Sequence, residues 1–365
     1  METSHFLRNI SKNGEKTDVA SSSIYEIKNE ENKHLKTKLK TYENNNKNKN
    51  NNVVIQYFRT FIYYTRARSN VYIFAFATLV SLILGSNGFA NVNPVIATSA
   101  VIAGYFMALA AYVYNDITDF EVDKINKTNR PSVTGKATKR QIVIMVYVLN
   151  GIALLLTSLI NFYTLIVSIT FIALGVAYSH PKLNLKDKFP LKTVVTAAGA
   201  GLLSLLGGAA ALTTTNTNFY LSYSLLPTIY AALFFFAFFF ILGPLGDIAD
   251  LKGDRAVGRR TFPIVIGIRS TIMMMFSIPI TIILMTTLLA YYYYDSISNS
   301  TSIITGIYHM NPLGIYFTIG SCIATMAFIL RVSKKANDVL AIKSMRPKMR
   351  FLHIILQISL LLAFI

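Results

Sequence analysis

The sequence predicts an all-α integral membrane protein with nine transmembrane helices around a central cavity, and three observations support this prediction. Of the 365 residues, 53% are hydrophobic and only 14% are charged, which is too apolar for an ordinary soluble domain. Three stretches, Val71–Tyr114, Ile142–Ser179 and Thr193–Gly246, contain no charged residue, and each is longer than the roughly 20 residues that one span requires. Beyond residue 52, lysine and arginine lie only near alternate connections between the expected spans.

The N-terminal part differs in composition from the rest. Residues 1–52 are rich in Asn, Lys, Ser and Glu, and this composition predicts a disordered cytoplasmic tail. Residues 53–365 are expected to form the transmembrane domain. Its first segment, Val53–Asn70, combines apolar and aromatic residues with Arg59, Arg66 and Arg68, as a helix at the membrane interface would.

Polar, glycine and proline positions divide the apolar stretches into nine candidate helices. They are Val71–Phe89, Pro94–Tyr114, Gln141–Ile160, Tyr163–Tyr178, Thr193–Leu212, Leu225–Gly246, Ser270–Tyr292, Pro312–Arg331 and Phe351–Ile365. The last of these is short for a span. Because the number is odd, the two termini are expected on opposite sides of the membrane.

The basic residues predict the topology. Ten of the 35 lysines and arginines lie in the tail, and the other 25 precede the first span or follow spans two, four, six and eight. Positive charge marks the cytoplasmic side, so the N-terminus and these four loops are expected in the cytoplasm, with the protein in the cell membrane. The net charge of +18 therefore needs no nucleic acid as a partner.

Acidic residues beyond the tail are few and clustered. Seven of the ten fall in two clusters, each at the cytoplasmic end of an even-numbered span. Both clusters have the spacing Asp-x-x-Asp-x-x-x-Asp, which places the carboxylates on one helix face. The aspartates are Asp116, Asp119 and Asp123 in the first cluster and Asp247, Asp250 and Asp254 in the second, and the seventh acidic residue is Glu121 in the first. Corresponding positions differ by 131, which predicts an internal repeat that offers two acidic helix ends to one site.

Carboxylates on one face repel one another unless cations lie among them. Oxygen ligands without His or Cys at ligand spacing favour a hard cation, and Mg²⁺ completes its shell with substrate phosphate oxygens. The basic residues after each cluster, among them Lys124, Arg130 and Arg259, predict phosphate contacts, so the whole pattern predicts a diphosphate clamp. The alternative is that the carboxylates pair only with flanking lysines and arginines.

A further candidate segment is Tyr178-Ser-His-Pro-Lys182, after the fourth span. Tyr178 either belongs to the aromatic belt at the membrane interface or presents its π face to a developing cation. Lys182 is then placed to reach a leaving phosphate.

Four ordered motifs resemble those of the UbiA superfamily of intramembrane prenyltransferases. They are Asn115-Asp-x-x-Asp-x-x-x-Asp123, Arg130-Pro-x-x-x-Gly135, Tyr178-x-x-x-Lys182 and Asp247-x-x-Asp-x-x-Gly-Asp254-x-x-x-Gly-x-x-Thr-x-Pro263. The resemblance covers about residues 57–365. It implies a helical bundle in which two Mg²⁺ ions and a prenyl diphosphate bind in a central cavity.

The same resemblance implies roles for individual residues. Asn115 and the six aspartates would hold Mg-diphosphate, Arg130 and Lys182 would contact phosphate, and Tyr178 would face the allylic cation. The second acidic motif is similar to that of the archaeal ether-lipid branch, which implies geranylgeranyl transfer to geranylgeranylglyceryl phosphate, with Arg66 and Arg68 near the acceptor phosphate.

The sequence does not decide which molecule accepts the prenyl group. The chlorophyll-synthase branch is similar in the same motif, so an aromatic quinone precursor or a chlorophyll- or haem-type acceptor is an alternative. The segment Arg66-Ala-Arg-Ser-Asn70 also departs from the Arg-Pro-x-Asn start that is usual in the ether-lipid branch. The sequence does not indicate an oligomeric state.

Two other classes of membrane protein use paired acidic helix ends. CDP-alcohol phosphotransferases require Asp-Gly-x-x-Ala-Arg within one motif, which neither cluster has. A non-enzymatic cation transporter would hold its acidic residues near the membrane midplane, whereas here they lie at the cytoplasmic ends of the spans.

Overall fold

The structure is a computed structural model that describes residues 53–68, 71–86, 88–126, 129–213, 221–298, 310–336 and 338–364. The predicted tail, residues 1–52, lies outside the described residues. The chain divides into two units, Met1–Arg59 and Thr60–Ile365. The site, and every element from α3 onward, belong to the second unit.

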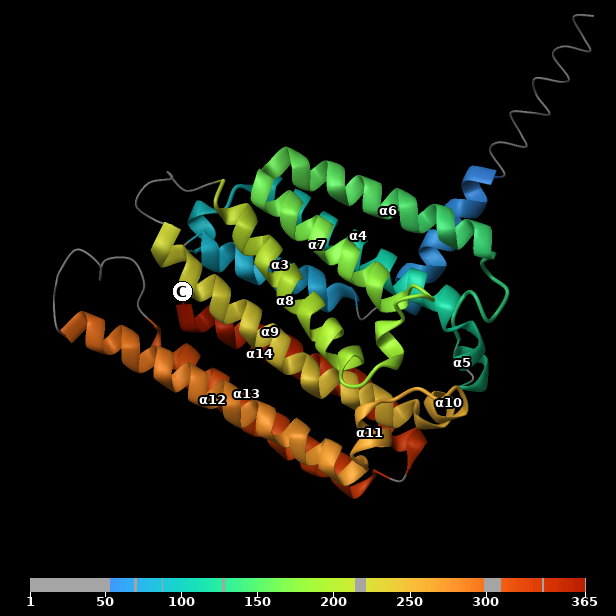
Figure 1. Ribbon diagram of the computed structural model, residues 1–365. Coiled ribbons are helices and arrows are strands. Elements are labelled where there is room, and N and C mark those ends of the chain that lie inside the picture. Colours follow the sequence, from blue (N-terminus) through green and yellow to red (C-terminus); the bar gives the residue numbers. More distant parts are fainter. Residues whose placement is uncertain are drawn as a thin grey trace, which may run out of the picture. The chain divides into compact units, whose positions relative to one another are not determined.

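Helices make up the regular secondary structure of the described residues (Figure 1). A helix at Val53–Ala67 precedes α3. The following elements are α3 (Tyr72–Gly85), η3 (Phe89–Asn91), α4 (Pro94–Thr118), α5 (Phe120–Ile125), α6 (Lys139–Ile160), α7 (Phe162–Ser179), η4 (Leu185–Asp187), α8 (Leu191–Ala211), α9 (Leu221–Ala249), α10 (Leu251–Ala256), α11 (Phe262–Val265), α12 (Ile268–Ser298), α13 (Pro312–Lys334) and α14 (Val339–Phe364).

The prediction of an all-helical membrane protein is confirmed. Eight of the described helices are long and apolar enough to span a membrane, and a ninth span results if Val53–Ala67 and α3 are counted together. The expectation of a short last span is wrong, because α14 begins at Val339 and contains 26 residues. Pro347 lies inside α14. A proline inside a helix removes one backbone hydrogen bond and its ring crowds the carbonyl four residues earlier, so the packing of the rest of the helix must offset this cost.

Asparagine and threonine side chains define where several long helices begin. Asn93, Asn161 and Asn311 accept hydrogen bonds from the first backbone N–H groups of α4, α7 and α13. Thr138 and Gln141 form a capping box at the start of α6. These caps satisfy donors that a helix leaves unpaired, and they fix the chain direction at the turns between spans.

Small and hydroxyl side chains allow the central helices to pack closely. α8 lies between α3 and α9 (Figure 1). The Thr78 hydroxyl of α3 donates to the Leu203 carbonyl of α8 at 2.8 Å. Gly207 of α8 packs against the Thr78 carbonyl, where there is no room for a Cβ atom. Such contacts replace the hydrophobic driving force that is missing between helices in lipid.

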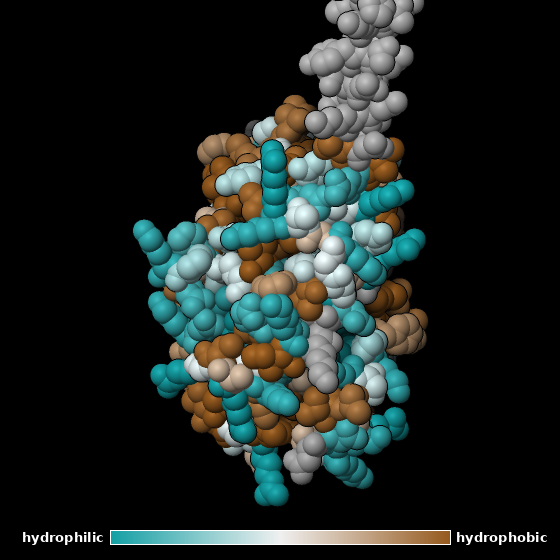
Figure 2. Space-filling model, turned by 90° about the vertical axis from the view of Figure 1, so that its right-hand side faces the viewer, coloured by the Kyte–Doolittle hydropathy of each residue, from teal (hydrophilic) through white to brown (hydrophobic). Residues whose placement is uncertain are grey.

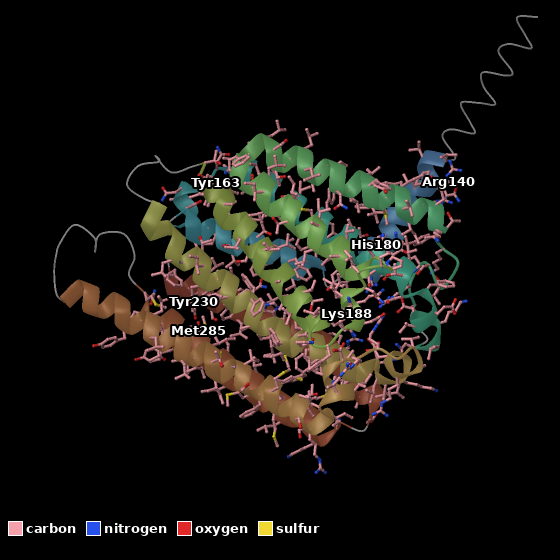
Figure 3. All side chains as sticks on the ribbon, viewed as in Figure 1. Arg140, Tyr163, His180, Lys188, Tyr230 and Met285 are labelled. Atoms are coloured by element: carbon pink, nitrogen blue, oxygen red, sulfur yellow. The ribbon has the colours of Figure 1, made fainter. Side chains whose placement is uncertain are left out.

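One end of the bundle is polar. It carries α5, η4 and α10, and we call it the acidic end because both acidic segments, Asp116–Asp123 and Asp247–Asp254, lie there. Figure 2 shows this end with hydrophilic residues gathered between apolar surfaces. Of the residues labelled in Figure 3, Arg140, His180 and Lys188 lie toward this end, whereas Tyr163 and Tyr230 lie toward the other.

The close contact at Gly207 leads us to expect that a larger side chain there destabilises the protein. Gly207→Ala should lower the free energy of unfolding by about 1–3 kcal/mol, because the new methyl group overlaps the Thr78 carbonyl and forces α3 and α8 apart. Gly151→Ala in α6 is the matched control, since a Cβ there meets no described atom within 4 Å. The midpoint of thermal unfolding in detergent, followed by circular dichroism, measures both. Equal midpoints for the two variants would contradict this account of the packing.

Candidate functional site

Both acidic segments bend the chain in the same way. α4 ends at Thr118 and α5 begins at Phe120, with Asp119 between them at φ −98° and ψ 10°. α9 ends at Ala249 and α10 begins at Leu251, with Asp250 between them at φ −105° and ψ 11°. The two short helices have six residues each. The 131-residue offset therefore holds for the bend as well as for the carboxylates, while an internal repeat of the whole fold stays a prediction.

The first acidic segment is buried and paired with basic residues. Asp116 is fully buried and forms ion pairs with Arg68 and with Arg130, the latter at 3.1 Å. Arg130 also contacts Asp123. Arg130 follows α5 by a few residues, so the chain returns a guanidinium group to its own acidic segment.

The middle carboxylate of this segment, Asp119, forms ion pairs and hydrogen bonds with a different set of residues. Lys186 Nζ lies 2.7 Å from Asp119 Oδ1, and the Asn115 amide donates to Asp119 Oδ2 at 2.7 Å. Lys186 also donates to the Thr118 hydroxyl at 2.5 Å and to the Asn115 side-chain carbonyl at 3.3 Å. The loop after α7 therefore supplies the lysine that holds the end of α4.

The second acidic segment takes its cations from α8 and α14. Lys192, in the first turn of α8, lies 2.6 Å from Asp247 Oδ1 and 3.1 Å from Asp254 Oδ2. Arg346 of α14 lies 3.3 Å from Asp250 Oδ2. Each of the six aspartates predicted from the sequence thus forms at least one ion pair.

Arg259 joins the two segments. Its guanidinium group contacts Asp119 at 2.7 Å and Asp254 at 3.3 Å, and a third carboxylate, Asp187, at 2.5 Å. Gly258 has a φ of 71°, a conformation that glycine adopts without strain, so the chain reverses after α10 and turns Arg259 back toward the bundle. The two acidic helix ends therefore face one another through a shared cation.

Burial and charge act against each other at these carboxylates. Burial opposes ionisation of Asp119, but Arg259 and Lys186 outweigh it and lower the pKa of Asp119 below its usual range. At Asp123 burial prevails over the attraction of Arg130 and raises the pKa to about 6. The two carboxylates of one segment thus differ in their tendency to stay ionised.

A cavity of about 450 Å³ opens among these groups. Its wall includes Asp119, Asp123, Asp250, Asp254 and Arg259. An adjoining apolar cavity of about 120 Å³ lies among α4, α7 and α8. The two cavities share four lining residues, Phe74, Tyr112, Asn115 and Tyr178. The site therefore combines a charged compartment with an apolar one, and Tyr178 lies where they meet.

The structure separates the predicted site residues into two groups. Those at or directly behind the cavity wall are Asn115, Arg68, Arg130, Tyr178, Arg259 and the six aspartates. Arg66, Lys124 and Lys182 are instead exposed, and none of the three lines this cavity. Lys124 pairs with Glu121 at 3.4 Å.

Lys186, and not Lys182, is the lysine of this loop that contacts the first acidic segment. Lys182 lies in the turn after α7, where Leu183 N and Asn184 N donate to the His180 carbonyl, and this turn leaves its side chain in solvent. Lys186, one further turn along the chain, is buried against Asp119. Four more residues of the site were not predicted from the sequence: Lys192, Asp187, Arg346 and Arg350. The sequence Lys186-Asp187-Lys188 could have indicated part of this set, because it places an acidic residue between two lysines in a loop on the same side as both acidic clusters.

Comparison with known proteins identifies the family of this chain. The model of the UbiA prenyltransferase family matches residues 74–355. Digeranylgeranylglyceryl phosphate synthase of Sulfurisphaera tokodaii is 30% identical over 182 residues, which cover 50% of this chain and 61% of that protein. The protein of the same name from Methanothrix thermoacetophila is 26% identical over 242 residues, which cover 66% and 76%. The match with the Thermococcus sibiricus protein of this name spans 55% of its length, so the chain covers little more than half of some relatives.

Solved structures share the fold. One chain, from a study of digeranylgeranylglyceryl phosphate synthase in membranes, has a TM-score of 0.60 at 17% identity, and the match covers 84% of this chain and 98% of that one. A UbiA homologue from Archaeoglobus fulgidus bound to GPP and Mg²⁺ has a TM-score of 0.55 at 14% identity, with 80% and 99% covered.

The different environments of Lys182, which is exposed, and Lys186, which is buried, can be tested. Lys186→Met should lower the free energy of unfolding by about 3 kcal/mol or less, because removing one partner leaves a buried carboxylate under-compensated while Arg259 still faces Asp119. Lys182→Met should change it by less than about 0.5 kcal/mol, as exposed substitutions generally do. Titration with SDS in detergent micelles measures both. A larger loss of stability for Lys182→Met than for Lys186→Met would contradict the contact between Lys186 and Asp119.

Proposed function

This chain belongs to the UbiA prenyltransferase family, and we propose that it transfers a prenyl group from a prenyl diphosphate to an acceptor embedded in the membrane. The observation that supports this most directly is the pair of acidic helix ends that face one cavity, joined by Arg259. An apolar compartment adjoins that cavity, as a substrate with a charged head and a hydrocarbon chain requires.

We propose that the six aspartates hold two Mg²⁺ ions together with the diphosphate. Asp116 Oδ2 and Asp247 Oδ2 are buried and have no hydrogen-bond partner among the described residues, so oxygen ligands suited to a hard cation are available. Within the described ranges no three His, Cys, Asp or Glu side chains converge closely enough to hold a metal ion by themselves. Such a donor set suits Mg²⁺, which takes one or two carboxylates per ion and completes its shell with phosphate oxygens and water.

The chain's own residues can then perform the transfer. Bound Mg²⁺ would supply positive charge to the diphosphate as it leaves. Arg130, Lys186 and Arg259 are placed to bind its oxygens in exchange for the carboxylates that they hold here. Tyr178 would present its ring to the allylic carbon as positive charge develops there. The apolar compartment would bind the prenyl chain and exclude water from that carbon.

We propose geranylgeranylglyceryl phosphate as the acceptor and the geranylgeranyl group as the one transferred, in ether-lipid synthesis. The support is the name shared by several relatives and the likeness of the second acidic motif to the ether-lipid branch. In this reaction the acceptor hydroxyl oxygen forms a bond to the allylic carbon, the bond to diphosphate breaks, and the hydroxyl proton is lost. By the charge pattern of the loops, the acidic end and the N-terminus would face the cytoplasm.

A direct assay tests the activity and its acceptor. Purified full-length protein, supplied with radiolabelled geranylgeranyl diphosphate, geranylgeranylglyceryl phosphate and Mg²⁺, should yield a doubly prenylated lipid that chromatography and mass spectrometry identify. EDTA should abolish the product. Transfer to an aromatic acid alone would assign the protein to quinone synthesis, and no transfer to either acceptor would overturn the proposal.

Individual carboxylates can be tested by isosteric variants. Asp119→Asn and Asp250→Asn should each reduce turnover by about a hundredfold or more, because each keeps the side-chain shape but removes the charge that holds the cation. Glu121→Gln is the matched control, since Glu121 belongs to the first segment but is 75% exposed and pairs only with Lys124 among the described residues. Near-normal turnover of either aspartate variant would refute a site built from both segments.

A further inference from the structure

The charged cavity has a second basic wall that the proposed chemistry has not used. Arg346 and Arg350 of α14 both line it. Arg350 has no ion pair or hydrogen bond with any described residue. Arg346 has one acidic partner, Asp250 at 3.3 Å, in a contact whose side chains are 32% and 24% exposed. α14 therefore brings two guanidinium groups to the cavity with little negative charge to match them.

Each of the other basic residues of the cavity wall already forms ion pairs with carboxylates. Arg68 and Arg130 contact Asp116, Lys192 contacts Asp247 and Asp254, and Arg259 contacts three carboxylates. Asp116 and Asp247, directly behind the wall, balance these cations. The positive charge left over lies at α14, where Asp250 pairs with Arg346 and no described carboxylate pairs with Arg350. A half-buried guanidinium group without a counter-charge is unfavourable, so this imbalance favours an anionic ligand beside α14.

The chain holds these two arginines in a defined place. Their i, i+4 spacing puts both on one face of α14. Arg346 lies along α9 at Gly246, where a Cβ atom would lie 3.0 Å from its Nη2. Lys343 Nζ donates to the Asn126 carbonyl at 3.3 Å, which ties the start of α14 to the end of α5. Two guanidinium groups on one helix face and beside the same cavity suit a phosphate, whose oxygens accept paired N–H donors.

We propose that Arg346 and Arg350 bind the phosphate monoester of the lipid acceptor, and this proposal rests on the proposed function. Phosphate could also come from the donor diphosphate, which has the same chemistry. The donor is already matched by the two acidic segments and the cations between them, on α4, α5, α9 and α10. The arginines of α14 form a separate anionic subsite, so they select an acceptor that carries a phosphate over a neutral or purely aromatic one.

The test separates the two substrates kinetically. In full-length protein, Arg346→Gln and Arg350→Gln should each raise the KM for geranylgeranylglyceryl phosphate by roughly tenfold or more, the factor that a hydrogen bond between charged groups contributes. For Arg350→Gln the KM for geranylgeranyl diphosphate should stay within about twofold, since Arg350 pairs with none of the carboxylates that hold the donor. Arg346→Gln also removes the partner of Asp250, so its donor KM is expected to change as well. Arg350→Lys should recover part of the loss. Lys348→Gln, which removes the same charge from an exposed position of α14, is the control and should match the wild type.

Two further measurements make the result specific to the acceptor phosphate. With geranylgeranylglycerol, which lacks the phosphate, the wild type and Arg350→Gln should have equal activity. Without Mg²⁺ or donor, geranylgeranylglyceryl phosphate should raise the thermal unfolding midpoint of the wild type but not that of Arg350→Gln, which also shows that the variant is folded.

The outcomes distinguish this proposal from the one on which it rests. If both variants behave like Lys348→Gln, or if Arg350→Gln raises the donor KM as much as the acceptor KM, the subsite on α14 is refuted while the prenyltransferase activity stands. If the wild type does not prenylate geranylgeranylglyceryl phosphate at all, the proposed function fails, and the subsite fails with it.

Discussion

The clustering of six carboxylates, five of them buried, at the ends of two membrane helices is the constraint on which the rest of this structure depends. An unpaired carboxylate in such a place is strongly unfavourable, so each one must meet a cation, and few cations are available in apolar sequence. The chain supplies them from the loop after α7, from the first turn of α8, from the loop after α10 and from α14. The ion pairs thereby determine which loops fold back over the acidic end, and they create a cavity whose wall consists of charged groups of both signs.

Much of this could be predicted from the sequence because the signals are local or periodic. Apolar stretches bounded by polar residues predicted that each long helix from α3 onward exists, although not where α14 begins, and the aspartate spacing predicted two acidic segments related by 131 residues. The structure places Asp119 and Asp250 in nearly the same backbone conformation, each between a long helix and a short one. A spacing that repeats together with a bend is a stronger signal than either alone, because it reflects the same local geometry at two places in the chain.

The choice of cationic partners could not be predicted in this way. Lys182 and Lys186 are four residues apart in the same loop, and only the turn at His180 and the left-handed residue Asn184, at φ 45°, decide that the second lysine reaches Asp119. The basic residues before the last span were attributed to topology alone. Arg346 and Arg350 reach the cavity because α14 begins earlier than its hydrophobicity indicates and continues through Pro347. Long-range packing decides both cases, and no local pattern encodes it.

Arg259 contacts carboxylates of both acidic segments, and this sharing has a thermodynamic consequence. Any ligand that displaces Arg259 from Asp119 also changes the electrostatic environment of Asp254, because one guanidinium group serves both. The free energy of occupying one segment therefore depends on whether the other is occupied. By linkage the dependence is equal in both directions, so the two halves of the site behave as a cooperative pair and not as two independent binding positions.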